Sequence, residues 1–495
     1  MPFLLLLLLS VILVGDKWPA PLWEDGPFSN YPWLVGFTWS GVLALILTAF
    51  FLALCIRLAI HSRPERREAI LERYASMRLY HLMSLFVFYG VSLYVLGWGW
   101  TVQYLCTPAV AEGAEGPGEM LPGAELLILA PFLVSLIASW ACFYDADKAL
   151  HDRNPGSQGT FWSRRDYLSF HVRQNLALII APLGLMIAMK GLQRAVPEGI
   201  GYAIAAGLVV AVFIGLPWIL RLVLNLKPLP DGPLRTRLLA AARRLNFRFS
   251  NILVWNTNGG VANAMVAGLL PYPRYILLTD RLISELPHDE IEAVFGHEVG
   301  HVKHAHMLFY VGFLVLSMSA VAWCCNLATD SVTLLKSLLA DNESWGTYPF
   351  VGIVAAYVFL VFGFLSRRCE RQADVFGCRV ISCDRHDCQS HDAQARLLPG
   401  GRGLCPTGIR TFIEALEKVA RLNGISRHKP GWLQSWQHST IARRVEFLQH
   451  MLLDPGLEPR FQRTVGRVKW GLVIGLACAF VVLAVIQWWH ELGQL

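Results

Sequence analysis

Runs of apolar residues, separated by polar connections, dominate the pattern of this chain. Each long run has enough residues for a helix to cross a bilayer, which takes roughly 20. Eight such runs lie at about residues 33–57, 80–105, 124–144, 174–192, 200–224, 307–328, 348–365 and 470–490. Residues 3–14 are apolar but short, and they form either a ninth span or a signal-like segment. The pattern predicts a polytopic α-helical membrane protein with eight or nine spans.

The polar connections between the runs differ in charge. Residues 58–79 and 145–173 each carry five Lys or Arg residues. The mainly acidic connections are 16–32, 106–123 and 329–347. Because connections rich in Lys and Arg stay on the cytoplasmic side of a membrane, we expect the basic connections to face the cytoplasm. This orientation also places the two long polar segments, residues 225–306 and 366–468, on the cytoplasmic side.

The two long polar segments have the pattern of a globular domain. In the first we expect a helix at 234–246, strands at 252–255, 261–266 and 275–279, and a helix from Pro287 that continues into the span near Met307. In the second we expect helices at 366–374, at 411–422 and from residue 438. The expected domains are therefore 1–224 (N-terminal transmembrane bundle), 225–306 (first half of the globular domain), 307–365 (transmembrane hairpin), 366–468 (second half) and 469–495 (C-terminal transmembrane helix).

Composition agrees with a membrane protein and argues against nucleic-acid binding. The chain is 54% hydrophobic and only 16% charged, whereas a soluble protein carries roughly 25% charged residues. Basic residues beside membrane spans account for the net charge of +7. We expect contact with the lipid bilayer and none with nucleic acid.

The sequence His297-Glu298-Val-Gly-His301 is an HExxH motif within the helix expected from Pro287. Histidines four residues apart lie on one face of a helix, so both rings can bind a single Zn²⁺. Glu298 lies on the adjoining part of that face, where its carboxylate can take a proton from a zinc-bound water molecule. The alternative is an ordinary helix with two surface or core histidines.

A catalytic zinc needs a third protein ligand and one open position. Glu370 is the best candidate, because it lies 69 residues after His301 (370 − 301 = 69), just beyond a span that returns the chain to the same side. Asp374, one helical turn later, can accept the other ring proton of a zinc-bound histidine. The alternative is that residues 367–374 are a solvated helix end with salt bridges.

Several of the 11 cysteines fall in one loop. The residues concerned, with two nearby histidines, are Cys378, Cys383, Cys388, Cys405, His386 and His391. They could form a second metal site, although their spacing fits no common zinc module. The simpler interpretation is a loop with reduced cytosolic thiols, since the odd cysteine count and the absence of CxxC do not indicate a disulfide framework.

Four motifs occur in an order that resembles one known family. They are Asn263-Ala264 with Gly268, the HEVGH motif at 297–301, the SRRCERQAD stretch (366–374) and the HSTIARRV stretch (438–445). Together they resemble the membrane zinc metallopeptidases that include the CAAX prenyl endopeptidase and the HtpX heat-shock protease. HExxH alone is only moderately specific, but this ordered set, with a hairpin of spans before Glu370, is highly specific. The resemblance spans about residues 228–450.

The resemblance implies a metal site and a fold. His297, His301 and Glu370 would bind one Zn²⁺ per chain, Asp374 would support them, and Glu298 would act as general base and acid. The implied fold is mainly α: a polytopic membrane protein with a cytoplasmic α+β, zincin-like metallopeptidase domain.

The resemblance also implies roles in substrate binding. Asn263 and Ala264 would lie on an edge strand that pairs with an extended substrate. His438 and Arg444 would stabilise the oxyanion, although the proline that often follows this histidine in the family is Ser439 here. The alternative for this pair is an ordinary capped basic helix.

We therefore expect an integral membrane zinc metalloendopeptidase that cleaves membrane-associated or misfolded polypeptides on the cytoplasmic side, at the plasma membrane if the source is bacterial. One alternative is the processing of a defined precursor, which could be lipidated. Another is a transporter, channel or scaffold with a catalytically silent metal-binding domain. The sequence favours an enzyme because every catalytic position of the family is occupied. The first five or six spans are either an anchor or a substrate-gathering bundle.

Overall fold

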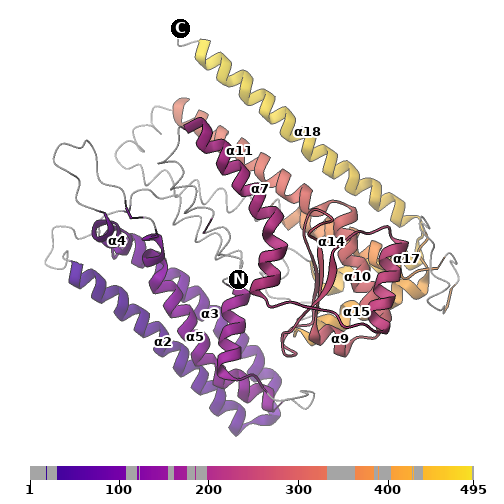
Figure 1. The fold of residues 1–495 in the computed structure, drawn as a ribbon, viewed down its shortest axis with the longest axis horizontal. Coiled ribbons are helices and arrows are strands. Elements are labelled where there is room, and N and C mark those ends of the chain that lie inside the picture. Colours follow the sequence, from indigo (N-terminus) through magenta and orange to yellow (C-terminus); the bar gives the residue numbers. More distant parts are fainter. Residues whose placement is uncertain are drawn as a thin grey trace. The chain divides into compact units, whose positions relative to one another are not determined.

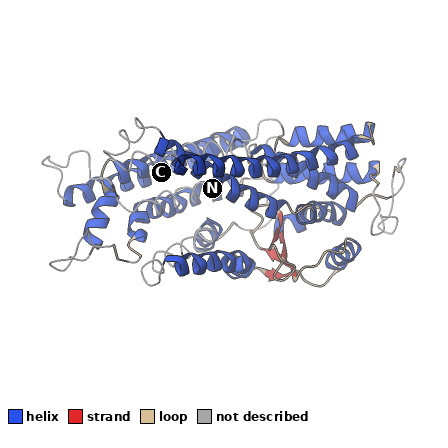
Figure 2. Ribbon diagram, turned by 90° about the horizontal axis from the view of Figure 1, so that it is seen from above, coloured by secondary structure: helices blue, strands red, loops and turns tan. Residues whose placement is uncertain are grey.

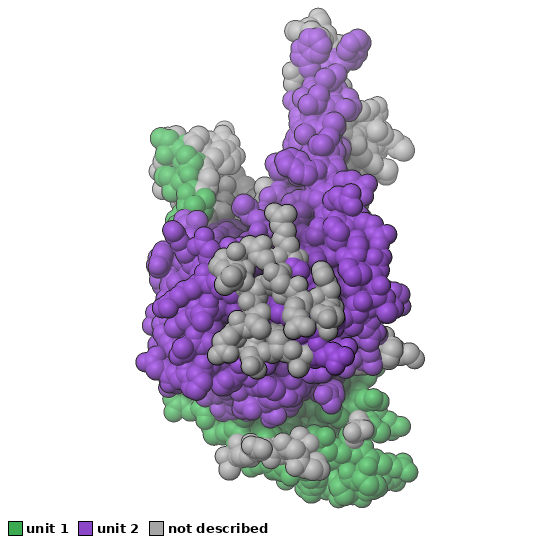
Figure 3. Space-filling model, turned by 90° about the vertical axis from the view of Figure 1, so that its right-hand side faces the viewer, with its two compact units in different colours: residues 1–212 green, residues 213–495 purple. Residues whose placement is uncertain are grey.

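The computed structural model describes residues 31–107, 120–121, 123–153, 161–175, 198–331, 363–383, 388–389, 403–425 and 439–492, together with positions 18, 184, 360 and 427. The chain divides into two compact units, Met1–Val212 and Phe213–Leu495, which Figure 3 colours separately. Each unit has its own hydrophobic core.

Unit 1 consists of long helices packed around aromatic side chains. Its described elements are α2 (Tyr31–Ser62), η1 (Pro64–Arg66), α3 (Arg67–Tyr94), α4 (Trp98–Cys106), α5 (Glu125–Asp152) and the first part of α7 (Glu198–Val223). Helices α2 and α5 pack along one another, and α3 contacts both (Figure 1). Tyr89, Phe132 and Trp140 are buried in this core. Arg78 of α3 forms an ion pair with Asp147 of α5 at 3.2 Å.

Several described helices are suited to cross a membrane. Three are long and apolar enough by themselves: Trp33–Ser62, Leu126–Asp152 and Leu457–Trp489. Among the described residues the number rises to five if two bent helix pairs, 69–106 and 288–321, each count as one span. The expected spans at 174–192 and 348–365 lie largely outside the described residues, and so does segment 3–14. The total of eight or nine spans and the cytoplasmic orientation stay predictions.

Unit 2 combines a small sheet with helices (Figure 2). After α7 its described elements are β1 (Lys227–Pro228), α8 (Pro233–Arg244), β2 (Asn251–Trp255), β3 (Ala264–Ala267), β4 (Tyr275–Thr279), α9 (Asp280–Glu285), α10 (His288–Lys303), α11 (His306–Ser331), α14 (Gly363–Val380), α15 (Pro406–Leu422), α17 (Ile441–Leu453) and α18 (Leu457–Leu492). This confirms the expected mainly helical fold with a small sheet.

The four strands form one sheet in the order β1-β2-β4-β3. Strand β2 is parallel to β4, whereas β3 is antiparallel to β4. Strand β3 is therefore at the edge of the sheet. It begins at Ala264 rather than at the expected residue 261, because a turn occupies the residues before it. Asp280 holds this turn by accepting hydrogen bonds from the backbone N–H groups of Thr257 and Gly259, each at 2.8 Å.

Helix α10 lies at the centre of unit 2. It begins after Pro287, with two acidic residues in its first turn, where the helix dipole favours negative charge. Ile291, Phe295 and Val299 recur every four residues and are fully buried in a core shared with α8 and the sheet. Burial of each such side chain stabilises the fold by about 1.5–3 kcal/mol. Buried Glu292 is neutralised by Arg237 and Arg244 of α8, at 2.7 and 3.1 Å.

The expected continuation of α10 into the next span is wrong. Helix α10 ends at Lys303, His304 is its C-cap, and α11 starts as a separate helix at His306. Between them Ala305 has a φ of 50°, in the left-handed region, which a continuous right-handed helix does not allow. The HExxH helix therefore belongs to the globular part of unit 2, and α11 leaves it at an angle of 44°.

Candidate metal centre

His297 and His301 of α10 and Glu370 of α14 converge on one point. One ligand atom of each residue lies within 4.8 Å of the others. The two Nε2 atoms are 3.2 Å apart, and the Glu370 carboxylate lies 3.5 Å from Nε2 of His301 and 3.8 Å from Nε2 of His297. Two imidazole nitrogens and one carboxylate are a typical donor set for a catalytic zinc with one open position. The donor chemistry of the group therefore fits the expected metal.

Small residues allow α10 and α14 to approach closely at this point. A Cβ atom on Gly296 would lie 3.2 Å from Cα of Gly377, and one on Gly300 would lie 3.2 Å from Cα of Ala373. The spacing of four residues on both helices is one helical turn, and the numbers run in opposite directions, so the helices are antiparallel here. Each glycine directly precedes a histidine of the group, so the close contact lies beside the convergent side chains.

Asp374 links the ligands to α17 and is completely buried. Its Oδ1 lies 2.9 Å from Nδ1 of His297, and its Oδ2 accepts a hydrogen bond of 2.9 Å from Nε of Arg444. Burial by itself would raise the pKa of Asp374, but Arg444 and His297 outweigh burial and lower it. The negative charge of Asp374 beside Nδ1 of His297 favours a proton on that nitrogen, which leaves the lone pair on Nε2 for a metal.

A second series of contacts orients His301. Its Nδ1 lies 3.0 Å from Nδ1 of His306, and Nε2 of His306 lies 2.9 Å from Oε1 of Gln372. Gln372 in turn donates from Nε2 to Oε1 of Gln462 at 2.6 Å. One placement of protons satisfies every contact of this series, from His301 to Gln462. In it, Nδ1–H of His301 donates to Nδ1 of His306, and Nε2–H of His306 donates to Oε1 of Gln372. This placement again leaves Nε2 of His301 as the free lone pair.

No pattern in the sequence predicts this series of contacts. His306, Gln372 and Gln462 belong to three different helices, α11, α14 and α18. The one available signal was a histidine at the first position of an apolar run, because a polar side chain at such a position needs a partner. His306 is fully buried.

Two further polar residues of the α10 region, Glu298 and His304, lie outside the group of three ligand atoms. Glu298 is half-buried, and its charge acts on Arg444. His304, a possible substitute ligand by its spacing from His297, does not belong to the described metal-binding group. Its ring is stacked on that of His306, with the ring centroids 5.6 Å apart.

Arg444 is 6% exposed, and its Nη1 also lies 3.6 Å from Oε2 of Glu370. It therefore contacts one expected ligand directly and another through Asp374. Thr440 is the N-cap of α17, and its side chain accepts a hydrogen bond from the backbone N–H of Arg443. His438 lies outside the described residues. The expectation that His438 and Arg444 stabilise an oxyanion stays a prediction.

The edge strand β3 contacts α10 and is held from a distant part of the chain. The Asn423 side chain accepts a hydrogen bond of 2.9 Å from N–H of Ala262 and donates one of 2.7 Å to its carbonyl. The carbonyl of Asn263 accepts a hydrogen bond of 3.0 Å from the backbone N–H of Thr279 in β4, and the N–H of Asn263 donates to the Thr279 hydroxyl at 2.8 Å. Since bonded pairs alternate along an antiparallel ladder, the backbone groups of Ala264 and Val266 point to the outer edge.

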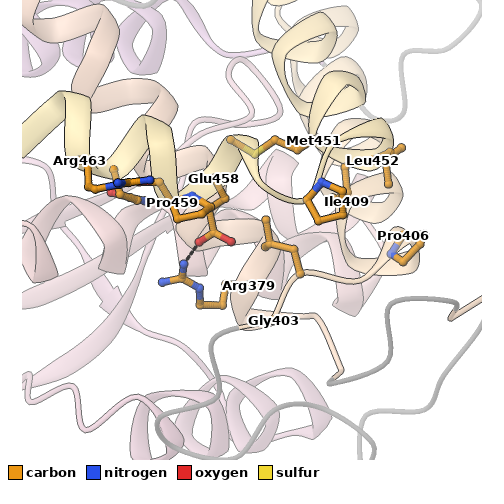
Figure 4. A pocket seen from close by; sticks show the side chains of 12 residues that line it. Arg379, Gly403, Pro406, Ile409, Met451, Leu452, Glu458, Pro459 and Arg463 are labelled. Carbon is orange, nitrogen blue, oxygen red and sulfur yellow. Dashed lines mark hydrogen bonds and ion pairs between the residues drawn. The ribbon is translucent and has the colours of Figure 1, made fainter.

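A pocket of about 560 Å³ lies between α14, α15, α17 and the start of α18. Its wall includes the ion pair between Arg379 and Glu458, which Figure 4 marks with a dashed line. Ile409 and Met451 contribute apolar wall. None of the three convergent ligands lines this pocket, so we do not assign the catalytic chemistry to it.

Comparisons with known proteins agree with this geometry. Residues 228–451 match the model of peptidase family M48. The chain carries a peptidase family M48 domain. The matched range contains His297, His301, Glu370, Asp374 and Arg444. The three convergent ligands and the two residues behind them therefore all belong to the M48 domain.

Curated relatives are similar to this chain over part of their length. The chain is 32% identical over 162 residues to the CAAX prenyl protease 1 homolog of Arabidopsis thaliana, which is 31% of this chain and 38% of that protein. It is 28% identical over 149 residues to the Protease HtpX homolog of Archaeoglobus fulgidus, or 29% of this chain and 42% of that protein. The match thus spans about two fifths of these relatives. Together with the family match it shows that part of this chain is similar to these proteases.

The fold similarity extends further than the sequence similarity. The crystal structure of S. mikatae Ste24p aligns with a TM-score of 0.52 at 15% identity. The alignment covers 84% of this chain and 99% of that one. It therefore includes helices outside the M48 domain, and at this identity it shows a shared fold.

Proposed function

We propose that this M48 protein is a zinc-dependent endopeptidase in which His297, His301 and Glu370 hold a single catalytic zinc. The observation that carries the proposal is the convergence of these three ligand atoms within 4.8 Å of one another. Both histidines have a partner at Nδ1, Asp374 or His306, so both present Nε2 to the same point. Three protein ligands leave one tetrahedral position free for water and substrate, as a catalytic zinc requires, and this group has three members among the described residues.

The mechanism assigns a separate task to each residue around the ion. When bound, zinc supplies a Lewis acid that polarises the scissile carbonyl and acidifies a water molecule. Glu298 takes the proton released from that water and passes it to the leaving amine. Arg444 keeps Asp374 ionised, and hydrogen bonds donated by Arg444 and His438 would stabilise the negative charge that develops on the substrate.

The substrate would bind at the edge of the sheet, along β3. An extended peptide can add to β3 as a further strand, with its backbone groups bonded to those of Ala264 and Val266. Asn263 is exposed just before the strand, where its side chain can contact the same peptide. The two hydrogen bonds between Asn423 and Ala262 hold the residues just before β3 in place. The added peptide would then lie along α10.

We propose membrane-associated or misfolded polypeptides as the substrates, cleaved on the cytoplasmic side. The basic connections 58–79 and 145–173 support this orientation. Processing of a defined, lipidated precursor is the second candidate, because a relative named CAAX prenyl protease 1 homolog is similar to part of this chain. Farnesylated and non-farnesylated versions of one peptide separate the two. Equal cleavage supports general proteolysis, whereas a strict requirement for the lipid supports precursor processing.

The Glu298→Gln variant tests the enzymatic proposal. Purified in detergent, it should keep its zinc but hydrolyse casein about 10²–10⁴-fold more slowly than the wild type, because an amide cannot carry the proton. Near-normal turnover with normal zinc content would show that Glu298 is not the general base. A wild-type protein that binds zinc but cleaves neither casein nor itself would instead favour a silent scaffold.

A further inference from the structure

Three cysteines form a second convergent group in unit 2. Cys383 follows the end of α14, Cys405 is the N-cap of α15, and Cys388 lies between them in the sequence. Their sulfur atoms all lie within 4.8 Å of one another. The three side chains are 0–4% exposed. This group shares no member with the group of His297, His301 and Glu370.

The number and spacing of the sulfur atoms favour a metal over simple packing or a disulfide. A buried cysteine is common as a small apolar side chain, but packing does not require three sulfurs to meet. A disulfide would use two of the three and leave one thiol buried beside it. Tetrahedral zinc with Zn–S bonds of about 2.3 Å holds its sulfurs roughly 3.8 Å apart, so the observed group needs to contract by about 1 Å at most.

The surroundings of the sulfurs suit thiolates. The backbone N–H of Gly408 donates to Sγ of Cys405 at 3.3 Å. Such a donor orients metal-bound sulfur and offsets its negative charge. The Thr407 hydroxyl, 3.4 Å from Sγ of Cys388, donates to the Cys388 carbonyl at 3.1 Å and so holds this cysteine beside the start of α15. The group also lies at the N-terminus of α15, a 17-residue helix, which favours negative charge.

The polypeptide around the group is held in place as well. The Ser382 hydroxyl accepts a hydrogen bond of 3.1 Å from the N–H of Cys405 and donates one of 2.8 Å to the carbonyl of Cys378. This double contact fixes the start of α15 against the end of α14. The arrangement of Cys383 and Cys405 thus does not depend on the residues between them.

We propose that Cys383, Cys388 and Cys405 bind a structural Zn²⁺ ion. Binding exchanges three thiol protons for one metal ion, oxidises nothing, and leaves the fourth tetrahedral position to a further donor such as water. The ion clamps the end of α14 to the start of α15. Helix α14 carries Glu370, and α15 ends at Asn423, whose side chain is bonded to Ala262. The second ion would therefore support the geometry of the first without taking part in hydrolysis. The expected zinc content rises from one to two ions per chain.

Zinc content of the full-length protein, purified in detergent under reducing conditions, tests the proposal. The wild type should contain two zinc ions per chain, and the double variant Cys383→Ser/Cys388→Ser should contain one. Cys378→Ser is the matched control, because Cys378 is also fully buried but lies outside the group. It should keep both ions. The variant Glu370→Ala should retain the cysteine-bound ion whether or not the chain is a peptidase.

A second measurement does not depend on the folding of any variant. Wild-type protein reconstituted with Co²⁺ should show thiolate-to-cobalt charge-transfer absorption, which a site of two histidines and a glutamate cannot produce. One zinc ion per chain with no such absorption would overturn the proposal. A disulfide between any two of the three cysteines, detected by mass spectrometry of protein alkylated before reduction, would also overturn it.

Discussion

Gly377 of α14 lies directly against Gly296 of α10, so close that a Cβ atom on Gly296 would come within 3.2 Å of Cα of Gly377. The same Cβ would lie 2.9 Å from the side chain of Val380. This contact determines how near the helix of the two histidines can come to the helix of Glu370. The distance between the convergent side chains of the two helices therefore depends on glycines, which have no side chain that could bind a metal.

Gly296→Ala should separate α10 from α14. Overpacking of this kind costs about 1–3 kcal/mol of folding stability, and it should weaken zinc binding because it moves Glu370 away from the histidines. Thermal unfolding and zinc competition with a chelator measure the two effects. Gly466→Ala is the control, since no other atom lies within 4 Å of its added Cβ. It should leave both properties unchanged or gain up to about 1 kcal/mol from helix propensity. Unchanged zinc affinity in folded Gly296→Ala would contradict the argument.

Glu370→Ala should lose catalytic zinc and hydrolysis together, because two histidines remain on a site that needs three ligands. His304→Ala should keep most of both, since His304 is the C-cap of α10 and lies outside the group. Atomic spectroscopy of both proteins, with circular dichroism as a folding check, gives the comparison. A folded Glu370→Ala protein that retains the ion at His297 and His301 would identify another residue as the third ligand.

His306→Ala should weaken zinc binding without removing any ligand. The Nδ1 proton of His301 would lose its acceptor, and loss of such a partner typically costs about 10–100-fold in metal affinity or activity. His306→Asn should recover part of the affinity, because an amide oxygen can accept the same proton. Zinc dissociation constants of the three proteins provide the test. Equal affinities would mean that His306 has only a packing role.

Asn423→Ala should weaken the binding of substrate more than the chemical step. It removes two hydrogen bonds from Ala262, each worth about 0.5–1.5 kcal/mol, and so loosens the segment that leads into β3. We expect KM to rise several-fold while zinc content and kcat stay near the wild-type values. Asn423→Asp keeps the acceptor for the N–H of Ala262 and should give an intermediate KM. A fall in kcat alone would argue against a role in holding the substrate strand.

The sequence carried information about local parts of the site and little about the contacts between helices. The four-residue spacing of His297 and His301 is a property of one helix and can be read directly. Glu370 could be proposed because the order of the motifs and an intervening hairpin return the chain to the same side. The resemblance also pointed to the edge strand, which the structure contains, although β3 starts later than expected.

Other features depend on tertiary contacts that no local pattern indicates. Asn423 reaches Ala262 across 161 residues of sequence. The break before α11 rests on a left-handed alanine, Ala305, where glycine would have been the usual signal. Gly296 and Gly377 look like ordinary helix-weakening residues until the two helices are placed together.

The position of Arg444 in the chain has a consequence for biosynthesis. Synthesis proceeds from the N-terminus, so the two histidines of α10 are made before Glu370 and Asp374, and Arg444 follows only 70 residues after Asp374. Until then the buried Asp374 carboxylate has no guanidinium to pair with. A chain translated only as far as Asp374 would thus hold an incomplete site, and the proposed proteolytic activity would begin only after Arg444 has been made. Neighbouring membrane proteins would be spared cleavage by a half-made enzyme.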